Sequence, residues 1–332
     1  MYQALKASRS IFVPIRHLQY HVRQWGEPRP GQAPLVLVHG WMDVAASWQF
    51  MVDALADDHW IIAPDWRGYG LTKVRIGAGP PQADASTLGG QRPHEVGSMG
   101  ARCAAPDNFW FADYLADLDA LLDHFAPGVA VNLVGHSMGG NVAMMYAGVR
   151  PERIRRLINL EGFGMPETRP AQAPGRYAQW LDELKALRRG EMNLKTYDSA
   201  EGVARRLMKT NPRLGADKAG WLARQWAAPN AEGRWAILGD AAHKVVNAHL
   251  YQLPETLAIY ARISAPVLSV TASDDSLSQW WKGRFTLAQY HERLKAVPNL
   301  HHAVIEDAAH MLHHDQPERL AGLIEGFLSN VS

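Results

Sequence analysis

Residues 131–140 are VNLVGHSMGG, and this stretch decides the fold. Its first four residues form a short, mostly apolar run that is typical of a buried strand, and a helical pattern begins just after Gly139. Between them stands GHSMG, which fits the pattern G-x-S-x-G. In a sharp turn between strand and helix the serine is strained, and the flanking glycines let both elements approach closely. The turn lifts the Ser137 hydroxyl clear of the sheet beside a helix N-terminus, so we predict a nucleophile there.

Short apolar runs alternate with amphipathic helices along most of the chain. Residues 111–125 and 318–327 place apolar side chains three and four positions apart, as in helices with one buried face. Residues 11–25 alternate loosely and suit an antiparallel hairpin at a sheet edge. This alternation predicts an α/β fold, with a mostly parallel sheet covered by helices on both faces. Strands are expected at 35–38, 60–63, 131–134, 157–160, 266–270 and 303–305.

Two segments interrupt the alternation. Residues 74–107 are rich in Gly, Pro, Ala and Ser without periodicity, which predicts a long surface loop. Residues 162–263 contain several helical patterns but no clear strand, which predicts a helical cap inserted over the sheet. The sheet domain then consists of residues 1–161 and 264–332.

The predicted nucleophile needs a base. A serine hydroxyl becomes reactive when a histidine takes its proton and an acid orients that histidine, in the chain order serine, acid, histidine. His310 fits as the base because it follows the last predicted strand by a short loop. His313 and His314 lie at the turn into the final helix, which favours a surface or supporting role for them.

The acid has two candidates, each at the carboxyl end of a predicted strand. Asp275 follows the strand at 266–270, where an orienting carboxylate is expected in a parallel sheet. Its distance from the strand end favours it over Asp274, whose expected role is to cap the next turn. Glu161, directly after the strand at 157–160, is the alternative. We expect Asp275 to be the acid, and Glu161 remains the alternative.

Acyl transfer also needs donors for the oxyanion. One is the backbone N–H of Met138, just after the nucleophile, and the second is the N–H of Trp41, in the loop after the strand at 35–38. Gly40 allows that loop to bend, and the expected role of His39 is to hold it by hydrogen bonds.

The segment at 65–70, DWRGYG, follows another predicted strand. An aspartate and an arginine at such a turn more often brace a loop than take part in chemistry. We therefore expect Asp65 and Arg67 to belong to the scaffold.

These motifs together resemble the α/β-hydrolase superfamily over nearly the whole chain, from residue 11 to residue 327. The run HGWMD at 39–43, with ASW at 46–48, is similar to the serine-hydrolase-like and esterase branch. The resemblance implies an eight-stranded sheet and a helical cap after the sixth strand. The motifs that carry it are HGW at 39–41, DxRGxG at 65–70, GHSMGG at 135–140, and His310 with Pro317.

The resemblance also implies a triad of Ser137, Asp275 and His310, and gives the oxyanion roles to Trp41 and Met138. Haloalkane dehalogenases and epoxide hydrolases have a similar cap and loops but carry Asp where this chain has Ser137. The serine therefore argues against both of those chemistries.

Composition narrows the class of protein further. The 332 residues include 34 Lys and Arg against 33 Asp and Glu, a net charge of +1, which argues against a nucleic-acid or anionic-membrane partner. The single cysteine, Cys103, excludes an internal disulfide. We expect no metal or organic cofactor, because the sequence shows no ligand cluster and no phosphate-binding glycine loop. Without a signal peptide or an apolar stretch of membrane-spanning length, a cytoplasmic protein is expected.

The sequence therefore predicts a carboxylesterase-like serine hydrolase that cleaves a small to medium hydrophobic ester through an acyl-enzyme, with water as co-substrate. A C–C bond hydrolase of ring-cleavage type, a lactonase and a thioesterase share the same triad and remain alternatives. A catalytically silent ligand-binding receptor on the same fold is the alternative from another class.

Overall fold

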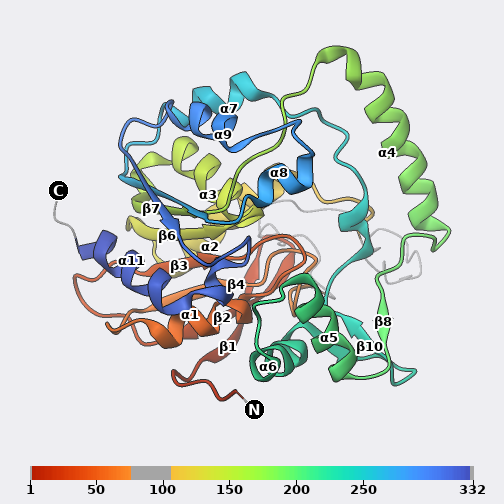
Figure 1. Cartoon of the computed structure of the whole chain (residues 1–332), viewed down its shortest axis with the longest axis horizontal. Coiled ribbons are helices and arrows are strands. Elements are labelled where there is room, and N and C mark those ends of the chain that lie inside the picture. The colour runs from red at the N-terminus through yellow and green to blue at the C-terminus, as the bar shows by residue number, and fades with distance from the viewer. Residues whose placement is uncertain (1, 76–105, 330–332) are drawn as a thin grey trace, which may run out of the picture.

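The computed structural model describes residues 2–75 and 106–329, and shows a central sheet with helices on both faces (Figure 1). Most of the predicted loop at 74–107, with Cys103, lies outside the described residues. No helix in the described part of the chain is long and apolar enough to cross a bilayer. The strands are β1 (Arg9–Ile15), β2 (Leu18–Trp25), β3 (Leu35–Val38), β4 (Ile61–Pro64), β5 (Lys73–Val74), β6 (Val131–His136), β7 (Ile154–Leu160), β8 (Thr196–Tyr197), β9 (Ala227–Pro229), β10 (Trp235–Ile237), β11 (Val267–Ala272) and β12 (Leu300–Ile305). The α-helices are α1 (Gln49–Ala54), α2 (Phe111–Phe125), α3 (Met138–Val149), α4 (Ala173–Arg188), α5 (Ala200–Thr210), α6 (Ala216–Trp226), α7 (Leu253–Tyr260), α8 (Ser276–Trp281), α9 (Leu287–Leu294), α10 (Leu312–Asp315) and α11 (Pro317–Ser329).

The large sheet confirms the predicted α/β architecture. Its strands follow the order β1-β2-β4-β3-β6-β7-β11-β12, and the two-residue strand β5 pairs with β2. Neighbours from β4 to β12 are parallel, whereas the pairs β1–β2 and β2–β4 are antiparallel. The opening hairpin thus lies at one edge, as its loose alternation predicted.

Both faces of the sheet are buried, which explains why its central strands are continuous apolar runs. In β3, Val36 and Val38 point into one core, which the helices α2 and α3 cover. Leu35 and Leu37 point into the other, which α1 and α11 cover. Side chains that alternate across a strand therefore supply two cores at once.

The segment between β7 and β11 lies largely to one side of the sheet (Figure 1). Its helices α5 and α6 form a small core of their own with Phe50 of α1, whereas α4 stands away from the body and buries none of its residues. The short strands β8, β10 and β9 form a second sheet that the sequence did not predict. Two or three residues are too few for an alternating pattern to be recognised.

The last helix of that segment belongs with the large sheet. Tyr260 of α7 is buried in the core that α3 covers, and α7 packs closely on α3. A Cβ at Gly148 of α3 would lie 2.1 Å from the carbonyl oxygen of Ile259, so only glycine permits this approach.

Asp65 and Arg67 brace the fold, as the sequence predicted. Asp65 accepts hydrogen bonds from the backbone of Ala45 and Leu71. Arg67 pairs with the fully buried Asp117 of α2 through Nε at 2.6 Å and Nη2 at 2.7 Å. The same carboxylate accepts a hydrogen bond from the Tyr20 hydroxyl at 2.7 Å. Together these hydrogen bonds connect the 65–70 turn to α2 and β2.

We expect Asp117→Ala to lower the free energy of unfolding by about 3–5 kcal/mol, because it removes the two-bond partner of the buried Arg67 guanidinium and leaves it only the 3.1 Å contact with Asp113. Urea denaturation measures the change. Asp123→Ala, on the same helix, is the matched control. It removes a carboxylate that is 62% exposed and pairs with Arg153, and should cost less than about 1 kcal/mol. Equal losses in the two variants would contradict the bracing role.

Candidate active site

Ser137 occupies the turn between β6 and α3, in the strained conformation that the sequence predicted. Its φ is 53° and its ψ is −116°, values that a non-glycine residue rarely adopts. A Cβ at Gly139 would lie 2.3 Å from the carbonyl oxygen of Val38, and one at Gly135 would lie 2.4 Å from that of Gly139. The flanking glycines are therefore required for the turn to pack against β3.

The loop after β3 lies against this turn. A Cβ added at Gly40 would be 3.1 Å from the Cβ of Ser137, which places residues 39–41 beside the nucleophile candidate. His39 is fully buried, accepts the Trp66 N–H at 2.9 Å through Nε2 and contacts the Gly40 carbonyl through Nδ1 at 2.8 Å. It holds the loop, as expected. The side chain of Trp41 is 53% exposed, and Met138 is the first residue of α3.

His310 lies in the turn between β12 and α10, on the loop that the sequence assigned to it. Its Nδ1 is 3.3 Å from Glu161 Oε2, and its backbone carbonyl accepts the His136 Nε2–H at 2.8 Å. Since His136 directly precedes Ser137, this bond joins the histidine loop to the nucleophile turn. The hydrogen bonds of the described residues include none from Ser137 Oγ to His310. Such bonds often tighten only when substrate binds.

The structure brings Glu161, the alternative acid, to His310. Glu161 directly follows β7, has a φ of 55° and is 2% exposed. One carboxylate oxygen accepts the Ala272 N–H at 2.8 Å, and the other faces His310. The positive φ at this strand end is a second strained position beside Ser137.

Asp275, the acid that the sequence favoured, makes different contacts. It caps α8, where Oδ1 accepts the Ser278 N–H at 2.9 Å and Oδ2 accepts the Ser278 hydroxyl at 2.6 Å. Asp274, expected to cap a turn, instead pairs with Arg213 at 2.9 Å. The reason for the difference is local: the Asp275 carboxylate is taken up by the unpaired donors at the start of the helix that follows it.

Burial governs the charges of the histidine–glutamate pair. Burial raises the pKa of Glu161 to about 8; the Ala272 N–H opposes the rise, and the Asp275 carboxylate adds to it. Burial also lowers the pKa of His310 to about 3, against a weaker pull from Asp43. His310 is therefore neutral at neutral pH, the state in which it can accept a proton from serine.

Sequence reasoning did not identify Trp280. Its ring meets the His310 ring edge to face, with centroids 4.2 Å apart, while 48% of the residue remains exposed. Trp280 is carried by α8, the helix that Asp275 caps. The only signal in the sequence is its position, five residues after a carboxylate at a strand end.

The residues that could hold a metal ion form two groups in the described part of the chain. Asp43, His136 and His313 are all buried, next to the nucleophile turn. The second group, Asp57, His59 and Glu325, lies at the surface or partly buried. The sequence expectation of a surface or supporting role for His313 and His314 holds only in part, since both are buried.

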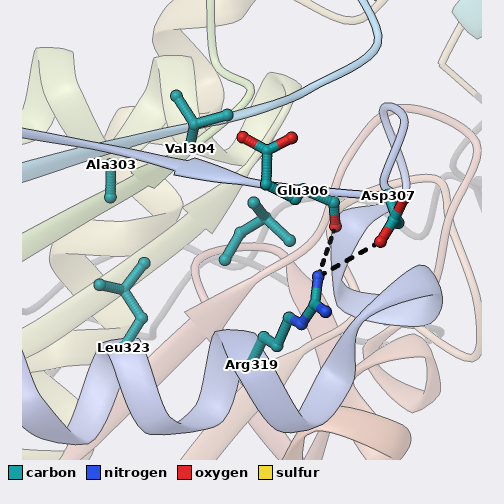
Figure 2. A pocket seen from close by; sticks show the side chains of 7 residues that line it. Ala303, Val304, Glu306, Asp307, Arg319 and Leu323 are labelled. Atoms are coloured by element: carbon teal, nitrogen blue, oxygen red, sulfur yellow. Dashed lines mark hydrogen bonds and ion pairs between the residues drawn. The ribbon is translucent and has the colours of Figure 1, made fainter.

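A shallow depression on the outer side of β12 is separate from this site (Figure 2). Residues 303–307 line it together with Leu323 and Arg319 of α11. Arg319 lies 3.5 Å from Asp307 Oδ2 and donates to the Glu306 carbonyl at 3.2 Å (Figure 2). None of the candidate catalytic residues lines this depression.

A buried strand, a strained serine turn, and a histidine–carboxylate pair at the carboxyl edge of a parallel sheet define the class of protein. The chain belongs to the α/β-hydrolase fold family, whose sequence model matches residues 33–317.

Similar proteins agree with that membership. A "serine hydrolase-like protein" of Danio rerio is 22% identical over 339 residues, which cover 97% of this chain and 89% of that protein. A solved thioesterase domain from the curacin biosynthetic pathway has 21% identity and a TM-score of 0.74, covering 96% of this chain and 99% of the domain. A Mycobacterium tuberculosis esterase has 18% identity and a TM-score of 0.65, covering 97% and 92% respectively. At these identities the structural likeness shows a shared fold.

Proposed function

We propose that this protein is a serine hydrolase that cleaves small to medium hydrophobic carboxylic esters through an acyl-enzyme on Ser137. The observation that carries the proposal is the contact of His310 Nδ1 with Glu161 Oε2, beside a serine in a strained turn. We propose Glu161 as the acid in place of Asp275, because Glu161 contacts the imidazole and Asp275 caps α8. The names of the similar proteins, which include an esterase and a thioesterase, support acyl transfer.

In the proposed reaction Ser137 Oγ attacks the ester carbonyl while His310 Nε2 takes its proton. Glu161 orients the ring through Nδ1 and stabilises the imidazolium that forms. The N–H groups of Trp41 and Met138 hold the developing oxyanion. His310 then protonates the departing alcohol, and water attacks the acyl-enzyme by the same steps to release the acid and free the serine.

The hydrophobic substrate class rests on two exposed indoles near the reacting groups. Trp280 lies edge-on to His310, and Trp41 follows Gly40, where an added Cβ would lie 3.1 Å from the Cβ of Ser137. Each side chain is about half exposed, at 48% and 53%. Exposed aromatic rings beside the triad favour an apolar acyl or alcohol group over a charged one.

Hydrolysis of a series of p-nitrophenyl esters of increasing acyl length tests the proposal. We expect turnover with an optimum at short to medium chains. The same assay is run on matched thioesters, lactones and ring-cleavage diketones. Comparison with the ester series shows which kind of bond the protein cleaves. If folded protein turns over only one of those, the ester proposal is wrong. If it turns over none and retains a bound ligand intact, the receptor alternative is favoured.

The raised pKa of Glu161 predicts how activity depends on pH. Only the ionised carboxylate stabilises the imidazolium, so kcat/KM should rise with pH as Glu161 loses its proton, at about pH 8. Asp275→Asn removes a negative charge that raises this pKa, so the rising limb should move to lower pH. A pH profile of kcat/KM on one ester measures both effects.

Asp274→Asn is the matched control for that profile. It neutralises the adjacent residue, whose carboxylate pairs with Arg213, and should leave the limb in place. A limb that stays fixed in Asp275→Asn, or moves to higher pH, would contradict the assignment of the limb to Glu161.

A further inference from the structure

Three buried polar atoms beside the nucleophile turn have no hydrogen-bond partner among the described residues. They are Asp43 Oδ2, His136 Nδ1 and His313 Nδ1. Their residues are only 3%, 2% and 1% exposed. Buried polar atoms are nearly always paired, because an unpaired one loses its hydration without compensation. The three residues lie close together, with His313 turned to Asp43 through its Nε2, so a ligand bound among them would supply partners that the protein itself does not.

The Asp43 carboxylate is fixed through one oxygen and free at the other. Oδ1 accepts the Val44 N–H at 2.9 Å, the Trp226 indole N–H at 2.8 Å and the Ser47 hydroxyl. These three donors orient the group and leave Oδ2 directed at His313, whose Nε2 is 4.0 Å away. Asp43 thus presents a single oriented oxygen in a buried environment.

The hydrogen bond of His136 determines which of its nitrogens carries a proton. Nε2 contacts the backbone carbonyl of His310 at 2.8 Å. A carbonyl can only accept, so Nε2 carries the hydrogen and Nδ1 of the neutral ring carries a lone pair. Histidines that bind metals through one nitrogen commonly donate the other to a backbone carbonyl in this way.

The spacing of the three groups fits a small cation. One ligand atom from each of Asp43, His136 and His313 lies within 4.8 Å of the other two. Ligands of a tetrahedral zinc ion, at about 2.1 Å from the metal, stand about 3.4 Å apart. Modest inward movements of the side chains would therefore close the site around an ion, whose fourth position water can fill.

We propose that Asp43, His136 and His313 form a binding site for a divalent transition-metal ion of the zinc type. Two imidazoles and one carboxylate suit Zn²⁺ or Co²⁺, whereas Mg²⁺ and Ca²⁺ prefer oxygen ligands throughout. The bound ion holds the His136 ring and, through its Nε2–H, the backbone of His310. It thereby joins the loop after β3, the nucleophile turn and the histidine loop, at a place where the sequence led us to expect no metal.

Titration of metal-free protein with Co²⁺, followed by displacement with Zn²⁺, tests the site. We expect one Co²⁺ per chain with the visible absorption of a four-coordinate ion, and a rise in Tm of at least about 3 °C with Zn²⁺ but not with Mg²⁺. These readouts need no turnover, so they are independent of the proposed ester hydrolysis. Ser137→Ala should bind Co²⁺ like the wild type, which separates this site from a metal bound at the nucleophile.

Two ligand variants and one control decide the assignment. Asp43→Asn keeps the shape and the Oδ1 contacts but loses the anionic ligand, and His313→Gln removes an imidazole. Each should raise the Kd for Co²⁺ at least about 100-fold, with folding checked by circular dichroism. His59→Gln is the control because His59 belongs to the second group, near the surface; this variant should bind Co²⁺ with the Kd of the wild type.

Saturable binding that survives in a folded Asp43→Asn or His313→Gln protein would overturn the proposal. So would the absence of saturable Co²⁺ binding, or a loss of binding in His59→Gln. If one ligand variant does not fold, the other carries the test.

Discussion

Ser137→Ala is expected to lower kcat on p-nitrophenyl esters by about 10⁴-fold or more. The substitution removes the atom that we propose forms the acyl-enzyme, and leaves the proposed oxyanion donors to supply the remaining catalysis. The backbone turn should survive, because alanine meets the same strain as serine at a φ of 53° and the neighbouring glycines are unchanged. Tm should therefore change by no more than a few degrees.

A fluorophosphonate probe gives an independent measurement of the same nucleophile. Intact mass should show one probe added per wild-type chain and none on Ser137→Ala. Ser329→Ala, at an exposed position in α11, is the control and should label fully. Labelling that persists on Ser137→Ala, or activity near that of the wild type, would remove Ser137 from the mechanism.

Glu161→Gln is expected to lower kcat by about 10²–10⁴-fold, because a neutral amide cannot stabilise the imidazolium and favours the wrong tautomer of His310. Asp275→Asn should lower kcat less than about tenfold, when measured at a pH above the rising limb of the pH profile of kcat/KM. Asparagine at 275 can still accept the Ser278 N–H and cap α8, so the helix should remain in place. Steady-state kinetics of both variants at that pH provide the comparison.

Glu161→Asp is the conservative control. Aspartate keeps the negative charge on a side chain that is one methylene shorter, so the carboxylate lies farther from His310. The kcat of this variant should therefore lie between those of the wild type and Glu161→Gln. If instead Asp275→Asn is the more damaging change, Asp275 would be the acid and Glu161 a structural carboxylate bonded to Ala272.

Strong local patterns predicted most of the fold. The apolar runs at 35–38 and 157–160 were recognisable as strands because both of their faces are buried, so no polar residue interrupts them except Asn159. The helix at 111–125 was predicted with its observed bounds, because its apolar face keeps a regular helical spacing. The strands β8, β9 and β10 were missed because each is too short to carry a pattern.

The sequence likewise predicted one part of the candidate site and missed another. The turn around Ser137 was predictable because its requirements are local: glycines where strand and helix touch, and a serine between them. The cluster of Asp43, His136 and His313 was not predictable, since its members meet only after β3, β6 and the segment after β12 come together. The contact of Trp280 with His310 was not predictable either, since it forms only when α8 packs beside the segment after β12.

The sequence by itself determined the α/β sheet and the positions of the serine turn and of the loop that carries His310, because each depends on neighbouring residues. Only the tertiary structure decided which carboxylate meets His310. Strands β7 and β11 are adjacent in the sheet, so Glu161 and Asp275 leave the same edge side by side, and no spacing along the chain separates them. The start of α8 turns Asp275 toward Ser278, while the positive φ of Glu161 aims its carboxylate at the imidazole.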